Sequence, residues 1–98
     1  MSYRLFIDDE RHPIDGDFIV VRSFDAAVDY VLRHGTPYYV QFDHDLGHGK
    51  NGLDFAKWLV DRSLDGFGFP KGYGVHSQNP VGRDNIKSIM DGYYRWLN

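Results

Sequence analysis

The sequence predicts an α/β domain with a mostly parallel, four-stranded sheet covered by helices on both faces. Three observations lead to this prediction. Strand-like segments alternate with segments that have the periodicity of amphipathic helices. The run FIVVR at 18–22 is apolar throughout, which is typical of strands buried in parallel sheets. The 98 residues suit one domain, residues 1–98, which is long enough to bury a core without disulfides.

Four short hydrophobic segments are the expected strands, at residues 3–7, 18–22, 38–42 and 72–76. A turn with Pro13 and Gly16 separates the first two. Only about ten residues make this connection, near the lower limit for a parallel crossover. The sequence therefore leaves open whether this strand pair is parallel or antiparallel.

Three amphipathic helices are expected, each after a residue suited to capping. The first follows Ser23, with apolar residues at helical spacing until Gly35 ends it. The second follows Asn51 and runs to about residue 64. The third opens at Asn79 and Pro80, because proline fits the first helical position, and its apolar stripe extends to residue 97.

Composition restricts the classes of function. The net charge of −3 provides no basic field, so duplex DNA binding is not expected, whereas a small nucleotide or an RNA end remains possible. The chain has no cysteine, which excludes disulfides and thiolate metal sites. No segment has the length of a membrane span and the amino-terminal residues are too acidic for a signal peptide, so we expect a cytoplasmic protein.

Polar, chemically active residues follow three of the expected strands. If the strand order is 2-1-3-4, the first and third strands are neighbours, and ligands of such sheets bind beyond the carboxyl ends of the strands. The residues concerned are Asp8 and Asp9 after the first strand, Asp43, His44 and Asp45 after the third, and His76, Ser77 and Asn79 after the fourth.

The acidic residues form a candidate metal site. Clustered carboxylates repel one another, and a divalent cation removes the repulsion. Oxygen ligands suit Mg²⁺, and Mn²⁺ also accepts imidazole. The candidate ligands are Asp8, Asp9, Asp43 and Asp45. The alternative is that these aspartates only cap turns.

His44 and His76 are candidates for proton transfer, together with Asp43 as a catalytic carboxylate. Either histidine could equally be a structural residue that hydrogen-bonds a carbonyl or a carboxylate. Near the start of the third helix, Arg83 could bind a phosphate or lie in solvent. The candidate substrate-binding residues are Ser77, Asn79, Arg83 and Asn85.

The run GHGKNG at 47–52 matches a dinucleotide-binding glycine pattern but follows the third strand, not the first. We interpret it as a flexible turn that leads into a helix.

Taken together, these segments resemble the cyclic-phosphate-processing receiver-like domains. The resemblance extends along nearly the whole chain and depends on LFIDDERHP, VVRSFDAAVDYV, FDHDLG, NGLDFAKWLV and VHSQNPVGRDNI. It implies a small receiver-like (flavodoxin-like) three-layer sandwich that lacks the first helix and the fifth strand of receivers. In receivers, residues matching Asp8, Asp9 and Asp43 bind Mg²⁺, and Asp43 falls at the phosphoacceptor position.

The departures from the receiver pattern affect the function that the resemblance implies. Receivers have a lysine at the end of a fifth strand, and no such Lys-Pro follows here, so phosphorelay signalling is disfavoured. The family's proposed role is processing of cyclic phosphates on nucleotides or RNA ends. Three hypotheses therefore stand: a Mg²⁺- or Mn²⁺-assisted hydrolase of a cyclic phosphodiester, a signalling module phosphorylated at Asp43, and a non-catalytic protein that senses or sequesters cyclic nucleotides.

Overall fold

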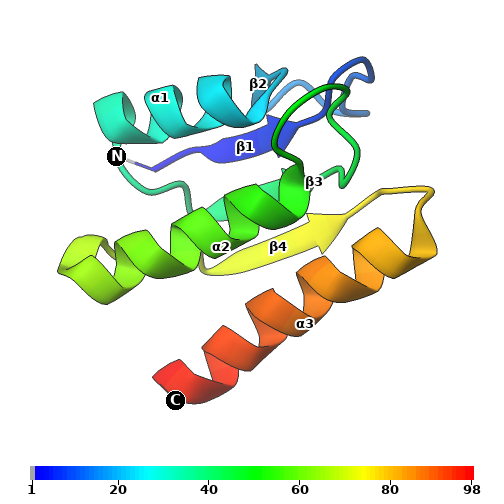
Figure 1. Ribbon diagram of the computed structural model, residues 1–98. Helices are drawn as coiled ribbons and strands as arrows, with labels where there is room; N and C mark the ends of the chain where they lie inside the picture. Colours follow the sequence, from blue (N-terminus) through cyan, green and yellow to red (C-terminus); the bar gives the residue numbers. More distant parts are fainter. Residues whose placement is uncertain (1) are drawn as a thin grey trace.

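The computed structural model describes residues 2–98 and contains the strands and helices that the sequence predicts, in the predicted order (Figure 1). The elements are β1 (Arg4–Ile7), β2 (Phe18–Val21), α1 (Phe24–His34), β3 (Tyr39–Phe42), α2 (Gly52–Arg62), η1 (Ser63–Phe67), β4 (Gly72–Val75) and α3 (Pro80–Leu97). The second helix ends two residues before the predicted boundary and continues as the π-helical turn η1, in which Gly66 has a positive φ of 97°.

The four strands form one sheet in the order β2-β1-β3-β4, which confirms the predicted order. All neighbouring strands are parallel, including β1 and β2, where Arg4 pairs with Phe18. The short connection over residues 8–17 thus makes a parallel crossover without a helix.

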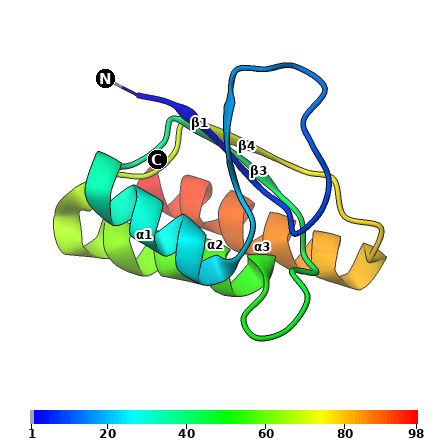
Figure 2. The ribbon, with the colours of Figure 1, turned by 90° about the horizontal axis from the view of Figure 1, so that it is seen from above.

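The coverage of the sheet differs from the three-layer prediction. Figure 2 shows α1, α2 and α3 on one face, while the 8–17 connection arches over the other face. The direction of each crossover explains the arrangement. The steps β2 to β3 and β3 to β4 run the same way across the sheet, so right-handed crossovers place α1 and α2 on the same face. The step β1 to β2 runs the opposite way, and its loop passes over the opposite face, which we call the open face.

The core lies between the sheet and the helices. Its fully buried side chains come from alternate strand positions and from one stripe of each helix: Leu5, Ile7, Ala27, Val31, Val40, Phe42, Phe55, Ala56, Ile86 and Met90. The predicted caps are confirmed, because the side chains of Ser23, Asn51 and Asn79 each accept a hydrogen bond from a backbone N–H in the first turn of their helix.

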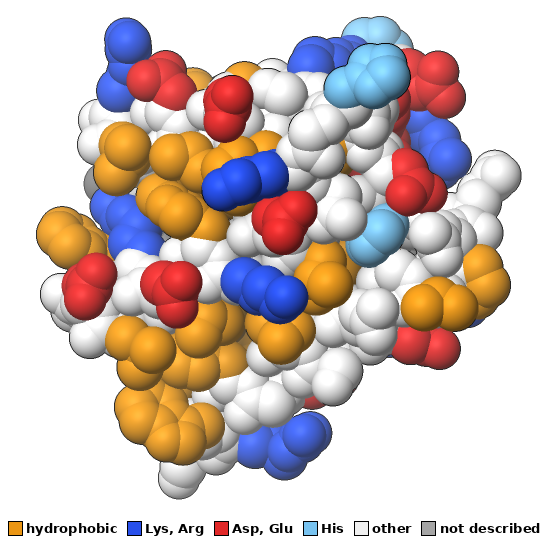
Figure 3. All heavy atoms as spheres, viewed as in Figure 1, with side chains coloured by type: hydrophobic (Ala, Val, Ile, Leu, Met, Phe, Trp, Pro, Cys, Tyr) orange, Lys and Arg blue, Asp and Glu red, His pale blue; other side chains and the backbone are white. Residues whose placement is uncertain are grey.

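Apolar side chains also gather on the surface, at the end of the helices away from the carboxyl ends of the strands (Figure 3). The exposed residues there include Leu64, Phe67, Trp96 and Leu97. Over residues 2–98, no helix combines the length and the apolar character needed to cross a membrane.

Candidate functional site

The carboxyl ends of β1, β3 and β4 meet, as the sequence predicts. The sheet ladder continues one residue beyond the strands, since Asp43 N–H donates to Ile7 O at 3.0 Å and His76 N–H donates to Phe42 O at 2.9 Å. Asp8, Asp43 and His76 therefore form a transverse row at the edge of the open face. One ligand atom of each residue lies within 4.8 Å of the others. We call these three residues the acidic row.

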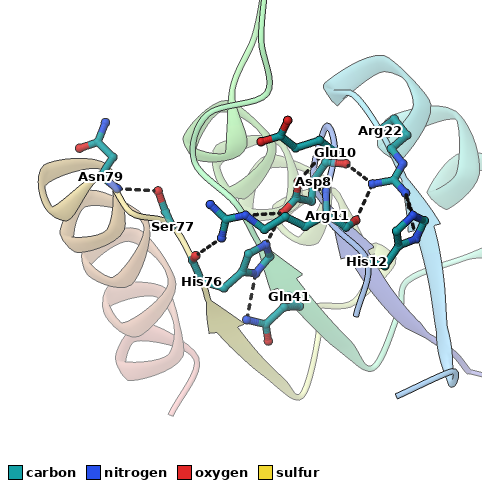
Figure 4. A network of polar contacts seen from close by, with 9 residues as sticks. All are labelled: Asp8, Glu10, Arg11, His12, Arg22, Gln41, His76, Ser77 and Asn79. Atoms are coloured by element: carbon teal, nitrogen blue, oxygen red, sulfur yellow. Dashed lines mark hydrogen bonds and ion pairs between the residues drawn. The ribbon is translucent and has the colours of Figure 1, made fainter. Parts of the chain in front are cut away.

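Asp8 is fully buried and is held by a dense set of hydrogen bonds (Figure 4). Its Oδ1 accepts from the backbone N–H groups of Glu10 and Arg11, both at 2.9 Å. Its Oδ2 accepts from His76 Nε2 at 2.8 Å. Burial acts to raise the pKa of Asp8, but the hydrogen bonds from Arg11, Glu10 and His76 outweigh it and hold the pKa below its usual value.

His76 is fixed on both sides of its ring. Gln41 Nε2 lies 3.1 Å from His76 Nδ1, while Gln41 Oε1 accepts from the Tyr39 hydroxyl at 3.0 Å. With the Gln41 amide in this orientation, Nδ1 accepts and the Nε2–H of the imidazole donates to Asp8. The ring also stacks on Phe6, with 4.7 Å between the centroids. This network orients His76 at the edge of the open face.

Asp43 is buried like Asp8, with only 5% of the residue exposed, but its electrostatic environment differs. Burial raises the pKa of Asp43, and the negative charge of Asp8 raises it further. His76, Arg11 and the Asp45 backbone N–H act in the opposite direction without cancelling the effect. The row therefore holds two neighbouring carboxylates with incomplete charge compensation, an arrangement that favours a bound cation.

Several predicted site residues lie outside the acidic row. Asp9 and Asp45 are exposed. The His44 ring packs against α3, because a Cβ on Gly82 would lie 2.3 Å from His44 Cγ. His44 Nδ1 also pairs with Asp45 Oδ1 at 2.9 Å. These contacts place the His44 ring between β3 and α3.

The predicted substrate-binding residues divide into two groups. Ser77 and Asn79 shape the start of α3: Ser77 Oγ accepts from Asn79 N–H at 3.1 Å, and Asn79 Oδ1 accepts from Gly82 N–H at 3.0 Å. Arg83 and Asn85 are exposed near the start of the same helix. Neither group contacts the acidic row through a hydrogen bond within residues 2–98.

The glycine run forms a turn, as interpreted from the sequence. Gly47 and Gly49 have positive φ values of 79° and 86°. Gly52 begins α2, and its N–H donates to His44 O at 2.8 Å. The run thus leads the chain from β3 into the helix and lies against the backbone of Asp43.

Sequence reasoning missed Gln41, Arg11 and Arg22. Arg11 donates to His76 O at 3.1 Å, and Arg22 donates to Asp8 O at 3.2 Å, so both bring positive charge to the acidic row (Figure 4). Alternation along a strand could have indicated Gln41, because it precedes Asp43 by two positions and faces the same side of the sheet. No comparable local signal marks the two arginines.

A parallel sheet with aspartates beyond neighbouring central strands defines a receiver-like α/β domain. The family model described as the cyclic-phosphate processing receiver domain matches residues 3–92. The chain therefore belongs to that family, which confirms the resemblance found in the sequence, and the family description connects the domain with cyclic-phosphate processing. Comparisons with curated proteins and with solved structures give no match.

Proposed function

We propose that this domain hydrolyses a cyclic phosphate on a nucleotide or an RNA end, at the acidic row. The observation that carries the proposal is the approach of Asp8, Asp43 and His76 from three strands to within 4.8 Å. Carboxylates that can hold a cation, beside an imidazole that can move a proton, are groups that can catalyse phosphodiester hydrolysis. The family's connection with cyclic phosphates supports this choice of substrate.

The donor set fits Mg²⁺ or Mn²⁺. Asp8 and Asp43 offer hard oxygen ligands. Burial, and after it the charge of Asp8, raises the pKa of Asp43, and a cation bound between the two carboxylates would compensate their charge. We propose these two residues as its main ligands. When bound, the cation would screen the charge of the phosphate and favour attack by water.

The side chains of the domain provide binding and proton transfer. Arg11 is partly exposed, and its guanidinium lies 4.0 Å from Asp8 Oδ2, where it can also bind a phosphoryl oxygen. In hydrolysis, a water oxygen bonds to phosphorus and one ester oxygen leaves. We propose that His76, protonated at both ring nitrogens and with the Gln41 amide turned so that its Oε1 accepts from Nδ1–H, gives its Nε2 proton to this leaving oxygen. The proton that the attacking water releases restores the ring, which Asp8 and Phe6 orient.

The test is a panel of nucleoside 2′,3′- and 3′,5′-cyclic phosphates and RNAs with cyclic-phosphate ends, each with Mn²⁺ and with excess EDTA. Products are followed by chromatography and ³¹P NMR. We expect turnover with Mn²⁺ and a loss of at least about a hundredfold in two variants: His76→Ala, which removes the proton-transfer group, and Asp43→Asn, which removes a charged cation ligand. The matched control Asp61→Asn changes an exposed aspartate of α2 and is expected to keep full activity.

Three outcomes separate the hypotheses. Full activity in EDTA would reject the cation while leaving His76 as the proton donor. Tight binding without turnover by any member of the panel would favour a sequestering protein over a hydrolase. Modification of Asp43 by acetyl phosphate or beryllofluoride, with no turnover of the panel, would favour a receiver-type signalling module.

A further inference from the structure

The open face contains a cavity that has no role in the hydrolysis proposed at the acidic row. It has a volume of about 400 Å³ and lies between the loop at residues 11–15 and the sheet. Phe6, Phe18, Gln41 and His76 line its sheet side. We call this cavity the loop–sheet slot. Its volume is in the range of small-molecule sites and suits a single nucleoside.

The slot opens directly onto the proposed catalytic groups. His76 and Arg11 line the slot, and both contact Asp8 in the acidic row. A larger cavity of about 710 Å³ lies farther along the sheet, around Arg4 and Tyr38, but its lining includes no residue of the acidic row. A ligand with its phosphate at the row would therefore extend into the loop–sheet slot.

The lining of the slot combines apolar surface with a few polar groups. Pro13, Ile14 and Phe18 provide apolar surface, and the Ile14 side chain is fully exposed. Gln41 and Asp15 provide an amide and a carboxylate. Gln41 contacts Tyr39 and His76, and within residues 2–98 these contacts use one N–H and one lone pair of its amide, which leaves a second N–H and a second lone pair for a ligand. A flat heterocycle with polar edges matches this mixture, because it would cover Ile14 and Phe18 and hydrogen-bond at its rim.

The position of the slot follows from the missing helical layer. Since the β1–β2 connection is a loop, the open face beneath it lacks the cover that a crossover helix would provide (Figure 2). Gly74 leaves room for the side chains of the network: a Cβ there would lie 2.5 Å from Gln41 Oε1 and 2.6 Å from the Tyr39 hydroxyl oxygen. The sheet and the loop together leave space beside His76.

We propose that the loop–sheet slot binds the nucleobase of a nucleoside cyclic phosphate whose phosphate lies at the acidic row. This inference rests on the proposed function, since it takes the position of the phosphate from it. It adds the class of substrate: a nucleoside derivative recognised through its base, with Ile14 and Phe18 as apolar contacts and Gln41 as a polar contact.

The test compares two ligands that differ only in the base. One is a nucleoside 2′,3′-cyclic phosphate, and the other is the 2′,3′-cyclic phosphate of 1-O-methyl ribose. Calorimetry gives the Kd of each, and NMR of the ¹⁵N-labelled protein locates the shifts. We expect the ligand without the base to bind about tenfold more weakly, in accordance with the contribution of one stacked base. Amide shifts at Ile14 and Phe18 should appear only with the nucleotide, whereas both ligands should shift the Arg11 amide.

Variants of two residues that line the slot, the exposed Ile14 and the half-buried Phe18, assign the contact. We expect Ile14→Ala to weaken the nucleotide about three- to tenfold without changing the Kd of the ligand that lacks the base. Phe18→Leu, which keeps apolar volume, is a second variant with the same expected direction. Leu64→Ala, a matched change at an exposed residue far from the slot, should change neither Kd.

The outcomes separate this inference from the proposed function. Equal Kd values for the two ligands, or no binding of either, would overturn the slot. Base-dependent binding that is lost in Ile14→Ala, but with no turnover, would uphold the slot and reject hydrolysis. Equal turnover of both ligands by the wild type and by Ile14→Ala would uphold hydrolysis and reject the slot.

Discussion

At the scale of single residues, Asp8 and Asp43 show how one row can hold two carboxylates in different electrostatic states. Asp8 receives two backbone N–H groups and the His76 ring, and its pKa is lowered. Asp43 is buried beside the charge of Asp8, and its pKa is raised. The two residues therefore contribute to stability with opposite signs near neutral pH.

We predict that Asp43→Asn raises the free energy of unfolding at pH 7 in EDTA, by an amount on the order of 1 kcal/mol. A group whose pKa is higher in the folded state stabilises the fold below its unfolded pKa, and this contribution is lost as the pH rises through the folded pKa. The charged Asp43 thus costs stability at pH 7, and the advantage of asparagine should shrink toward acidic pH. Urea unfolding at pH 7 and pH 4 measures the difference.

Asp8→Asn is the matched comparison and should act in the opposite direction. The lowered pKa of Asp8 stabilises the fold above its unfolded pKa, and this stability is lost as the pH falls through the folded pKa. The variant should therefore be less stable than the wild type at pH 7, with a smaller difference under acidic conditions. An Asp43→Asn protein less stable than the wild type at pH 7 would contradict the cost that burial and the neighbouring charge of Asp8 impose on the ionised Asp43.

At the scale of elements, the junction between β3 and α2 determines where Asp43 lies. A Cβ on Gly52 would lie 2.0 Å from the backbone carbonyl oxygen of Asp43, and a backbone atom has little freedom to move. Only glycine at the first helical position lets α2 approach the end of β3 this closely.

We predict that Gly52→Ala lowers the free energy of unfolding by about 2–3 kcal/mol, because overpacking against backbone forces the helix and the strand apart. The control is Gly16→Ala, where a Cβ would meet no atom within 4 Å and φ lies outside the positive range. Urea unfolding of the two variants gives the comparison. Equal stabilities would show that α2 shifts at little cost.

At the scale of the whole molecule, the acidic row exists only when three strands pair in the order β1-β3-β4. A cation bound there would stabilise the folded state alone, since the unfolded chain does not bring the ligands together. Ligand binding stabilises a fold by about 2.7 kcal/mol when its concentration is a hundred times its Kd.

We therefore predict that Mn²⁺ and Mg²⁺ raise the Tm of the wild type, measured against NaCl at the same ionic strength. Asp61→Asn, at an exposed aspartate, should show the same increase, and Asp43→Asn should show none. An equal increase in all three proteins would place the cation away from the acidic row. Differential scanning calorimetry provides the measurement.

Local sequence signals were sufficient to predict the helices and strands and part of the candidate site. Caps such as Ser23 and Asn51, and apolar periodicity along each helix, act within a few residues and can be recognised without tertiary contacts. The strand order and the meeting of Asp8, Asp43 and His76 were also predicted correctly, because parallel strands bring their carboxyl ends to one edge.

The remaining features depend on contacts between distant segments. The handedness of the crossovers placed α1 and α2 on one face, and α3 packs against α2 on that same face. Packing against Gly82 directed the His44 ring toward α3, away from the acidic row. Gln41 and Arg11 reach His76 across 35 and 65 residues of sequence. Neither the side of the sheet that stays open nor these partners can be obtained from local patterns, because each results from which chain segments lie beside one another after folding.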